Sequence, residues 1–408
     1  MTISNGVASP NVAANGHRRS TSFFQDHGIW KEAPVLIGTT RFEPRPDVRN
    51  IMITGGAGFI ACWLVRHLTL TYPHAYNIVS FDKLDYCSSL NNTRMLDGRR
   101  NFAFYQGDVT NPAEVVDCLE RYNIDTIVHF AAQSHVDLSF GNSYTFTHTN
   151  VYGTHVLLES ARKMRIKRFI HISTDEVYGE VDDDDDDLLE SSILAPTNPY
   201  AASKAAAEML VHSYQKSFKL PAIIVRSNNV YGPHQYPRNN PQIHLPPRAR
   251  RPGSPARRRL ADAALPVYNV GAADELSNLA LCRRLLAAFR IAPADFPRWI
   301  RHTHDRPFND RRYAVDAAKL RALGWEPQTA FDDGLGVTVA WYRRFGLRWW
   351  GDVAKVLTPF PVVAAREVVS DHAPVSDNPQ QDGWGWEVKR GKEKGTGDGG
   401  EGSSNGHV

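Results

Sequence analysis

Thr54-Gly-Gly-Ala-Gly-Phe-Ile-Ala61 (TGGAGFIA) directly follows the apolar run Asn50–Thr54 (NIMIT). Small residues at such a place let the chain turn tightly and bring backbone amides to a pyrophosphate at a helix N-terminus. An ordinary strand-to-helix turn can carry the same letters, so position matters more than composition. Asp82 closes the next apolar run, 24 positions after Gly58. A carboxylate there can accept hydrogen bonds from a ribose and would repel a 2′-phosphate, so the sequence predicts a dinucleotide site that favours NAD over NADP.

Short apolar runs alternate with amphipathic stretches on both sides of this motif. The predicted strands are Asn50–Thr54, Asn77–Phe81, Phe102–Tyr105, Thr126–Phe130, Arg168–Ile172 and Ala222–Arg226. The predicted helices between and after them are Phe59–Leu70, Pro112–Tyr122, Val151–Met164 and Tyr200–Phe218. This alternation is typical of an α/β fold with a Rossmann-type, doubly wound parallel sheet. Later helices, predicted at Asp274–Arg290, Ala314–Leu323 and Phe331–Phe345, would form a smaller C-terminal substrate lobe.

Composition divides the chain into five expected parts. Residues 1–48 and 356–408 are rich in small and polar residues and are expected to be largely disordered tails. Residues 49–237 form the expected NAD-binding domain with the catalytic residues, and residues 265–355 the substrate-binding lobe. Between them, residues 238–264 crowd Pro and Arg where neither a strand nor an amphipathic helix can form, which predicts an irregular insert.

The bulk composition excludes several other classes of protein. No apolar run approaches the ~18 residues that span a bilayer, and no signal peptide is evident, so we expect a soluble cytoplasmic protein without a membrane partner. The net charge is only +3, and its arginines cluster outside any aromatic-rich pattern, so no nucleic-acid partner is expected. The acidic run Asp182–Asp187 reads as a hydrated loop, and no metal site is predicted. The cysteines lack metal or disulfide spacing and are expected to be reduced: Cys62, Cys87, Cys118 and Cys282.

Tyr200 and Lys204 form a YxxxK pair, which lies on one face of a helix. The lysine charge favours the phenolate form, and so it can turn a weak base into a useful one. The predicted strand before this helix ends in HISTDEVYGE, which places Ser173, Thr174, Asp175 and Glu176 at the sheet edge where ligands bind. Two adjacent acids can divide acid and base work if their surroundings separate their pKa values. A surface tyrosine and two solvated acids are the alternative interpretation.

Residues 50–237 resemble the nucleotide-sugar 4,6-dehydratases of the extended short-chain dehydrogenase/reductase family. The resemblance rests on TGGAGFIA, HFAAQSHVD, NVYGTHVLLE, STDEVYGE, PTNPYAASKAAAE and SNNVYGPHQYP. Ala61 replaces the last glycine of the family's TGxxGxxG motif, which bears on how tightly the cofactor is held. Related epimerases share the Tyr/Lys pair but usually lack the Asp-Glu pair. Asp305–Tyr313 (DRPFNDRRY) is similar to the family's nucleotide-sugar segment, and its RPFND is closer to the UDP-glucose enzymes of plants and fungi than to the bacterial dTDP-glucose form.

The resemblance implies a closed redox cycle on one sugar. Tyr200 takes the proton of the 4-hydroxyl while hydride leaves carbon 4 for NAD, Thr174 hydrogen-bonds the oxygen, and Lys204 holds the phenolate. Glu176 removes the proton on carbon 5 as protonated Asp175 gives one to the departing 6-hydroxyl; hydride then returns to carbon 6 and carbon 5 is reprotonated. The implied product is a 4-keto-6-deoxy sugar.

The resemblance also implies binding residues and a dimer. The implied cofactor contacts are Gly55, Gly58, Phe59, Ile60, Asp82, Asp108, Val109, Ala131, Ala132, Thr149, Ser173, Tyr200 and Lys204. The implied substrate contacts are Ser134, Asn229, Arg306 and Asn309, with His135 and Asn228 beside them, although each can equally be a loop hydrogen-bonder. A homodimer would form through the helices at Val151–Met164 and Tyr200–Phe218.

The insert at residues 238–264 leaves alternatives open. In the family, the segment after YGPHQYP continues with elements that hold the nucleotide, whereas the Arg/Pro-rich stretch here resembles none of them and could reflect a reading-frame or splicing error in the gene. One hypothesis is a working UDP-glucose 4,6-dehydratase. The other is a catalytically impaired NAD-binding pseudoenzyme with an incomplete sugar pocket. A nucleotide-sugar 4-epimerase of the same fold is a further alternative, which the Asp175/Glu176 pair argues against.

Overall fold

The computed structural model describes residues 28–180, 187–237, 266–272, 274, 276–300 and 314–350, with two short strands at 363–364 and 367–368. The chain divides into two compact units, Met1–His372 and Ala373–Val408, and every described residue lies in the first. Arg306, Asn309 and the insert at 238–264 lie outside the described residues, and the account below covers the remainder of the first unit.

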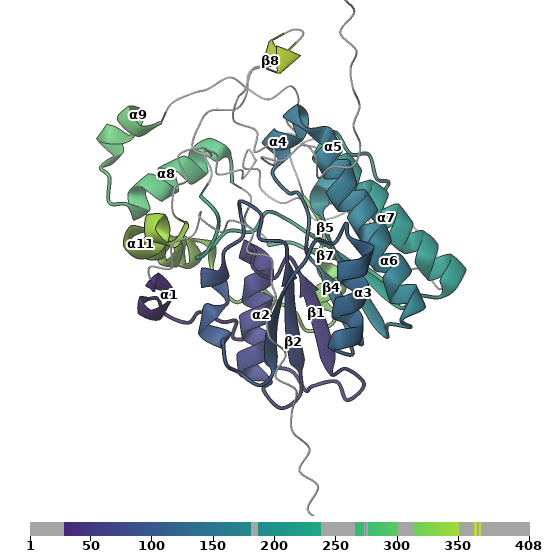
Figure 1. Ribbon diagram of the computed structural model, residues 1–408. Helices are drawn as coiled ribbons and strands as arrows, with labels where there is room; N and C mark the ends of the chain where they lie inside the picture. The colour runs from purple at the N-terminus through teal and green to yellow at the C-terminus, as the bar shows by residue number, and fades with distance from the viewer. Residues whose placement is uncertain are drawn as a thin grey trace, which may run out of the picture. The chain divides into compact units, whose positions relative to one another are not determined.

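A seven-stranded parallel sheet forms the centre of this unit (Figure 1). Its order is β3-β2-β1-β4-β5-β6-β7, so the direction of winding reverses between β1 and β4. The strands are β1 (Asn50–Thr54), β2 (Asn77–Asp82), β3 (Phe102–Gln106), β4 (Thr126–His129), β5 (Arg168–Thr174), β6 (Ala222–Ser227) and β7 (Val267–Val270). All neighbouring pairs are parallel; Ile51, for example, faces Ile78 of β2 and Thr126 of β4. In open sheets of this kind ligands bind at the carboxyl edge, where the order reverses.

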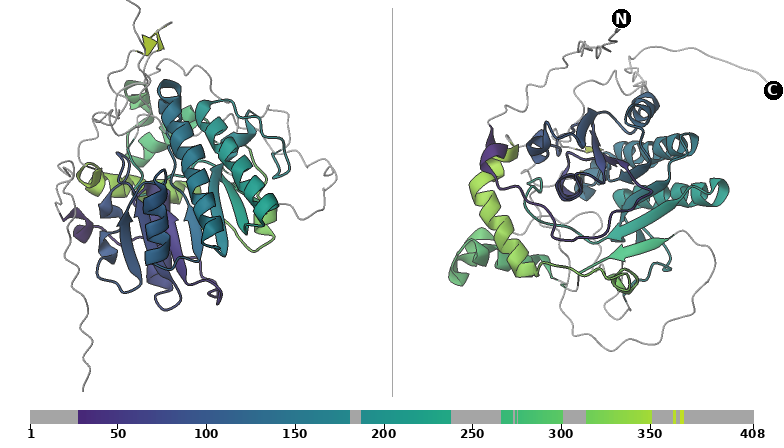
Figure 2. Two further views of the ribbon diagram at one scale, coloured as in Figure 1. Left: turned by 45° about the vertical axis from the view of Figure 1, so that its right-hand side comes forward. Right: turned by 90° about the horizontal axis from the view of Figure 1, so that it is seen from below.

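Helices lie on both faces of the sheet (Figure 2). The principal ones are α2 (Phe59–Thr71), α3 (Pro112–Arg121), α6 (Gly153–Lys163), α7 (Pro199–Phe218), α8 (Asn278–Ala288) and α11 (Phe331–Trp350). The shorter α-helices are α1 (Ile29–Glu32), α4 (Val136–Gly141), α5 (Ser143–Phe146), α9 (Phe296–Trp299) and α10 (Ala318–Arg321). Tighter turns are η1 (Leu90–Asn92), η2 (Arg94–Leu96), η4 (Asp175–Tyr178) and η5 (Pro293–Asp295); η3 (Thr147–Tyr152) is a π-helix, and β8 (Val363–Ala364) pairs with β9 (Glu367–Val368). The predicted α/β class and Rossmann-type sheet are confirmed.

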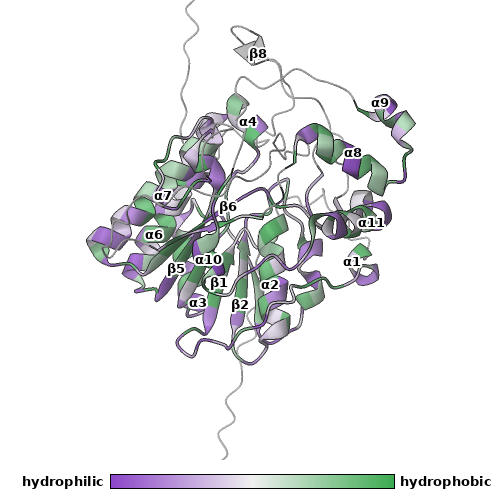
Figure 3. Ribbon diagram, turned by 180° about the vertical axis from the view of Figure 1, so that it is seen from behind, coloured by the Kyte–Doolittle hydropathy of each residue, from purple (hydrophilic) through white to green (hydrophobic). Residues whose placement is uncertain are grey.

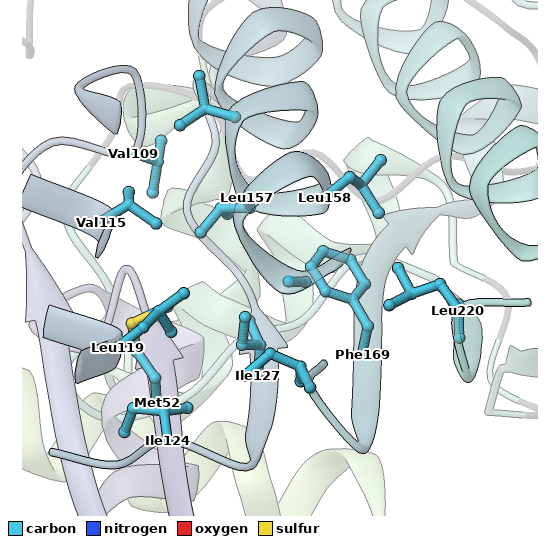
Figure 4. Close-up of a cluster of buried hydrophobic side chains, with 14 of the residues drawn as sticks. Met52, Val109, Val115, Leu119, Ile124, Ile127, Leu157, Leu158, Phe169 and Leu220 are labelled. Atoms are coloured by element: carbon cyan, nitrogen blue, oxygen red, sulfur yellow. The ribbon is translucent and has the colours of Figure 1, made fainter. Parts of the chain in front are cut away.

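Two apolar cores, one on each face, fix the sheet between the helices. On one face Met52, Ile127 and Phe169 of the sheet meet Leu119 of α3 and Leu157 of α6 (Figure 4). On the other face α2 lies beside β1 and β2 (Figure 3) and buries Ala61, Val65 and Leu68. Both faces are covered, so the strands carry nearly continuous apolar runs rather than alternating ones.

Several element boundaries differ from those predicted. The predicted helix Val151–Met164 begins earlier, as the π-helix η3, and continues as α6. Asp274–Arg290 shortens to α8 because Ser277 caps the helix, accepting the N–H of Ala280 at 3.1 Å. Ala314–Leu323 shortens to the single turn α10, whereas Phe331–Phe345 extends to Trp350.

Two of the expected domain boundaries also differ from what the structure shows. β7 lies inside the range 265–355 predicted as substrate lobe, but it pairs with β6 as the last strand of the main sheet. Residues 28–48 fall in the predicted N-terminal tail, yet α1 packs on α11 and Ile29 is buried with Trp341, Phe345 and Trp349. The tryptophan-rich end of α11 therefore forms a core with the chain's own N-terminal segment.

Candidate active site

The glycine-rich turn joins β1 to α2 as predicted, and its glycines are required by geometry. Gly55 has φ +69°, and a Cβ there would stand 3.0 Å from the backbone of Ala131. The Gly55 N–H donates to Phe81 O at 2.8 Å, and the Gly58 N–H donates to Gly55 O at 2.9 Å. Gly58 is the N-cap of α2 and leaves the helix without a side-chain cap. The first amides of α2, at Phe59 and Ile60, are thus suited to the pyrophosphate of a dinucleotide.

Asp82 ends β2 and braces this turn. Its carboxylate accepts the N–H of Ala57 at 3.0 Å and the N–H of Leu84 at 2.8 Å. Burial raises its pKa, and these hydrogen bonds work against that rise. A hydrogen bond with Ser88 also acts on this carboxylate, which still has acceptor capacity left, so the group fits a ribose hydroxyl and does not fit a 2′-phosphate.

The other predicted cofactor residues lie around the same edge. Asp108 accepts hydrogen bonds from Thr110 and lies 3.7 Å from Lys83 Nζ, so its carboxylate is already partly neutralised. The side chain of Val109 belongs to the apolar core, which leaves its backbone as the group that can face a ligand. Thr149 is buried on η3, and the N–H of Ala131, which precedes Ala132, donates to the Thr54 hydroxyl at 3.1 Å.

Gly55→Ala is expected to weaken both folding and NAD retention. A non-glycine residue in this left-handed conformation costs roughly 1–2 kcal/mol, and the contact with Ala131 adds to that cost. Gly98→Ala is the matched control, because Gly98 has φ +80° but nothing within 4 Å of an added Cβ. Thermal unfolding and NAD content after gel filtration measure both effects. An equal loss in the two variants would contradict the close approach inferred at Ala131.

The predicted catalytic residues converge where β5 runs into η4 and meets the start of α7. β5 extends two residues beyond the prediction, to Thr174, and all five side chains are buried: Thr174, Asp175, Glu176, Tyr200 and Lys204. Thr174 Oγ1 donates to Asp175 Oδ1 at 3.1 Å, and a hydrogen bond with Thr174 partly opposes the rise that burial causes in the pKa of Tyr200. Lys204 Nζ donates to the carbonyl of Ile172 at 2.6 Å, which ties the ammonium to β5.

The electrostatics of these groups favour the protonation states that acid–base chemistry needs. Burial, with the charge of Glu176 beside it, raises the pKa of Asp175 to about 8. The Asp175 Oδ2 atom is buried without a hydrogen-bond partner among the described residues, which further disfavours its ionised form. Burial lowers the pKa of Lys204 to about 8, and burial with the nearby acids raises the pKa of Tyr200. The protonated form of Asp175 is therefore favoured at neutral pH.

The turn that carries the two acids is anchored by a buried ion pair. Tyr178, at the end of η4, accepts a hydrogen bond from Arg226 at 2.8 Å and donates to Asn269 of β7 at 2.8 Å. Arg226 pairs in turn with Glu208 of α7, with Nη2 to Oε2 at 2.6 Å. β7 therefore holds the acid-bearing turn in place, although it follows the insert in the sequence.

The structure describes two of the four predicted substrate residues, and also Ser173, a predicted cofactor contact. Ser134 and Asn229 are exposed at the carboxyl edge, after β4 and β6 respectively. The Ser173 hydroxyl is buried and has no partner among the described side chains. Arg306 and Asn309 lie outside the described residues. Within the described ranges no group of His, Cys, Asp and Glu side chains could hold a metal ion, and no helix is long and apolar enough to cross a membrane.

Sequence reasoning missed two asparagines that hold the site together. Asn150 on η3 accepts the Gln133 N–H at 2.7 Å and donates to Ser203 of α7 at 2.8 Å. Asn198 caps α7 and donates to Glu176 at 3.0 Å. The Asn-Pro pair at Asn198 and Pro199 is a recognisable helix start, so the sequence could have predicted the cap. It could not have predicted the contact with Glu176.

Comparison with known proteins shows which family has this set of residues. Residues 52–245 match the family profile described as GDP-mannose 4,6 dehydratase. Human dTDP-D-glucose 4,6-dehydratase is 42% identical over 342 residues, which cover 78% of this chain and 97% of the human protein. This chain belongs to the nucleotide-sugar 4,6-dehydratase family. The predicted recognition is confirmed.

Other relatives of the 4,6-dehydratase family differ in length and nucleotide. A trifunctional UDP-glucose 4,6-dehydratase/UDP-4-keto-6-deoxy-D-glucose 3,5-epimerase/UDP-4-keto-L-rhamnose-reductase of Arabidopsis thaliana is 45% identical over 345 residues, and the match spans 50% of that protein. Among solved structures, the dTDP-glucose 4,6-dehydratase DesIV of Streptomyces venezuelae, crystallised with NAD, aligns with a TM-score of 0.64 at 32% identity, covering 74% of this chain and 99% of DesIV. Both the dTDP and the UDP branches of the family are thus close to this chain.

Proposed function

We propose that this chain is an NAD-dependent hydro-lyase that converts a nucleoside-diphosphate glucose into the 4-keto-6-deoxy sugar. The observation that carries the proposal is the pair Asp175 and Glu176, which meets Tyr200 and Lys204 at one buried edge, where burial raises the pKa of Asp175 and so favours its protonated form. The relatives named as dehydratases, and DesIV with its bound NAD, support it. An epimerase does not need two acids at this place, so the pair disfavours that alternative.

Bound NAD would supply reversible hydride acceptance from the sugar, and the residues at the edge fit it. The first amides of α2 would hold its pyrophosphate, and Asp82 a ribose. Tyr200 accepts the proton of the sugar 4-hydroxyl, and Lys204 stabilises the resulting phenolate. Glu176 removes the proton on carbon 5, which the neighbouring ketone has acidified. Asp175 gives its proton to the 6-hydroxyl as it departs as water. Return of the hydride to carbon 6 and of a proton to carbon 5 would complete the 4-keto-6-deoxy sugar.

The activity is expected to fall as the pH rises through about 8. Asp175 must be protonated to donate, and Lys204 must be charged to stabilise the phenolate; both have a pKa of about 8. The active forms of both groups therefore exist below that pH and are lost above it. The measurement is kcat against pH at saturating substrate. A kcat that stays level well above pH 8 would count against these assignments.

UDP-glucose is our proposed substrate, because the relatives with the higher identity are the plant UDP-glucose enzymes and because RPFND resembles the UDP branch. Separate incubations of the full chain with UDP-glucose and dTDP-glucose, followed by mass spectrometry for loss of one water, test both activity and nucleotide. Faster turnover of dTDP-glucose would overturn the choice of nucleotide. No product from either, with NAD still bound, would support a pseudoenzyme with an incomplete sugar pocket, and UDP-galactose would support an epimerase.

We also propose a cytoplasmic homodimer formed through α6 and α7. These helices leave apolar side chains exposed on their outer surfaces, including Met209 at 53% and Phe218 at 50%. The four cysteines are free, which suits a reducing compartment. Sedimentation analysis tests the dimer, and a monomer at micromolar concentration would contradict it.

A further inference from the structure

Asn198 uses both ends of its side-chain amide at the point where the catalytic helix begins. Oδ1 accepts the N–H of Ala201 at 2.8 Å, which is the N-cap of α7. Nδ2 donates to Glu176 Oε2 at 3.0 Å. The cap fixes the orientation of the amide, because a flipped group would set its NH2 against the Ala201 N–H and leave Glu176 facing an oxygen. The bond from Asn198 Nδ2 to Glu176 is therefore additional to the helix cap, which needs only the Oδ1 atom.

The two acids meet different surroundings as a result. Glu176 faces the amide donor of Asn198 and the N-terminal end of the 20-residue helix α7, whose dipole favours negative charge. Asp175 accepts the Thr174 hydroxyl at Oδ1, and backbone N–H groups of its own turn also act on it, but its Oδ2 has no partner among the described residues and burial keeps its pKa raised. A hydrogen bond to the charged form of a carboxyl favours that form.

Among the described residues, the titratable groups that interact with Glu176 include Asp175 on its own turn and Tyr200 on α7. Further along α7, Lys204 is committed to the carbonyl of Ile172, and Glu208 to Arg226. Both of these groups are neutral when protonated, and the amide of Asn198 gives Glu176 a directed donor that the Asp175 Oδ2 atom lacks.

We propose that Asn198 is a positioning residue that assigns the two acids their roles, by holding Glu176 ionised and aligned with Tyr200 while Asp175 remains the proton donor. The inference rests on the proposed dehydratase function and deepens it, because it explains how adjacent acids of similar chemistry can act as base and acid. It also makes one residue responsible for both the start of the catalytic helix and the state of the base.

Asn198→Ser separates the two contacts, since serine caps helices well but is too short to replace the amide donor. We expect kcat to fall by about tenfold to a hundredfold with KM unchanged. Without its donor the Glu176 pKa rises, so the base is protonated over more of the acidic range, and the acid limb of the kcat profile should move upward by about one pH unit. Asn198→Asp keeps the cap oxygen but places a second charge beside Glu176, and should move the limb further.

Asn111→Ser is the matched control, because Asn111 caps α3 through the N–H groups of Ala113 and Glu114, and α3 carries neither of the two acids nor the phenol. It should match Asn198→Ser in thermal unfolding while leaving kcat and its pH profile unchanged. If Asn198→Ser changes only thermal stability, or lowers kcat with no movement of the acid limb, Asn198 is a helix cap alone and the inference is wrong.

A measurement without turnover separates this inference from the proposed function. Infrared titration of the NAD-loaded enzyme follows the C=O stretch of protonated carboxyls, and we expect an added protonated acid at mildly acidic pH in Asn198→Ser that Glu176→Gln removes. An unchanged spectrum in Asn198→Ser would overturn the inference even if the wild-type enzyme is active. A wild-type enzyme that forms no product would count against the proposed function, whatever the infrared result.

Discussion

Tyr200→Phe is expected to lower kcat by between about a hundredfold and ten-thousandfold, because it removes the group that accepts the proton of the 4-hydroxyl. The loss should come without unfolding. The ring of Tyr200 packs against Phe146 and Val136, and phenylalanine keeps that packing. NAD content and thermal unfolding should therefore match those of the wild-type enzyme, while steady-state turnover of UDP-glucose collapses.

Tyr214→Phe provides the control for loss of a tyrosine hydroxyl on the same helix. The Tyr214 hydroxyl bonds Glu159 and His155 of α6, away from the carboxyl edge of the sheet. Its removal should leave kcat within the range of the wild type. A Tyr200→Phe enzyme that keeps most of its turnover would show that the phenol is not the base for the 4-hydroxyl.

Glu176→Gln is expected to lower product formation by a factor comparable to that of Tyr200→Phe. The step that it blocks is removal of the proton on carbon 5. With the base lost, the proton on carbon 5 should no longer exchange with solvent, so NMR in deuterium oxide should find hydrogen retained there. Asp175→Asn keeps the base and loses the acid, so it should still exchange the carbon 5 proton while failing to release water. Glu120→Gln, an exposed acid on α3, is the control for charge loss.

Equal exchange in Glu176→Gln and the wild type would contradict the role of Glu176 as base. The reverse pattern, with exchange lost in Asp175→Asn and kept in Glu176→Gln, would mean that the two acids hold the opposite roles. It would also contradict the role proposed for Asn198, since its donor would then act on the acid rather than the base.

The local sequence pattern was enough to predict the elements that depend on residues close together in the chain. The β-branched runs of β1 and β5, the tight turn at Gly55 and the i,i+4 spacing of Tyr200 and Lys204 depend on neighbours in the chain, and the structure confirms all of them. The acid pair was placed correctly because a parallel sheet brings the ends of its strands to one edge.

The remaining features depend on contacts between distant residues, which no window of sequence contains. Asn92 accepts the indole N–H of Trp349 at 2.8 Å and donates to Ala57 O at 2.8 Å, which ties α11 to the glycine-rich turn across most of the chain. Ile29 is buried by α11, so a polar-looking N-terminal segment folds where composition predicts disorder. β7 follows an Arg/Pro-rich stretch, and only its pairing with β6 reveals it as part of the main sheet.

The destination of a deuterium label tests most directly whether these groups act together on one sugar. UDP-glucose deuterated at carbon 4, incubated with the full chain and NAD, should give a 4-keto-6-deoxy product that carries the label on carbon 6. Label found at carbon 4 of UDP-galactose, or recovered only in unreacted UDP-glucose, would contradict the account.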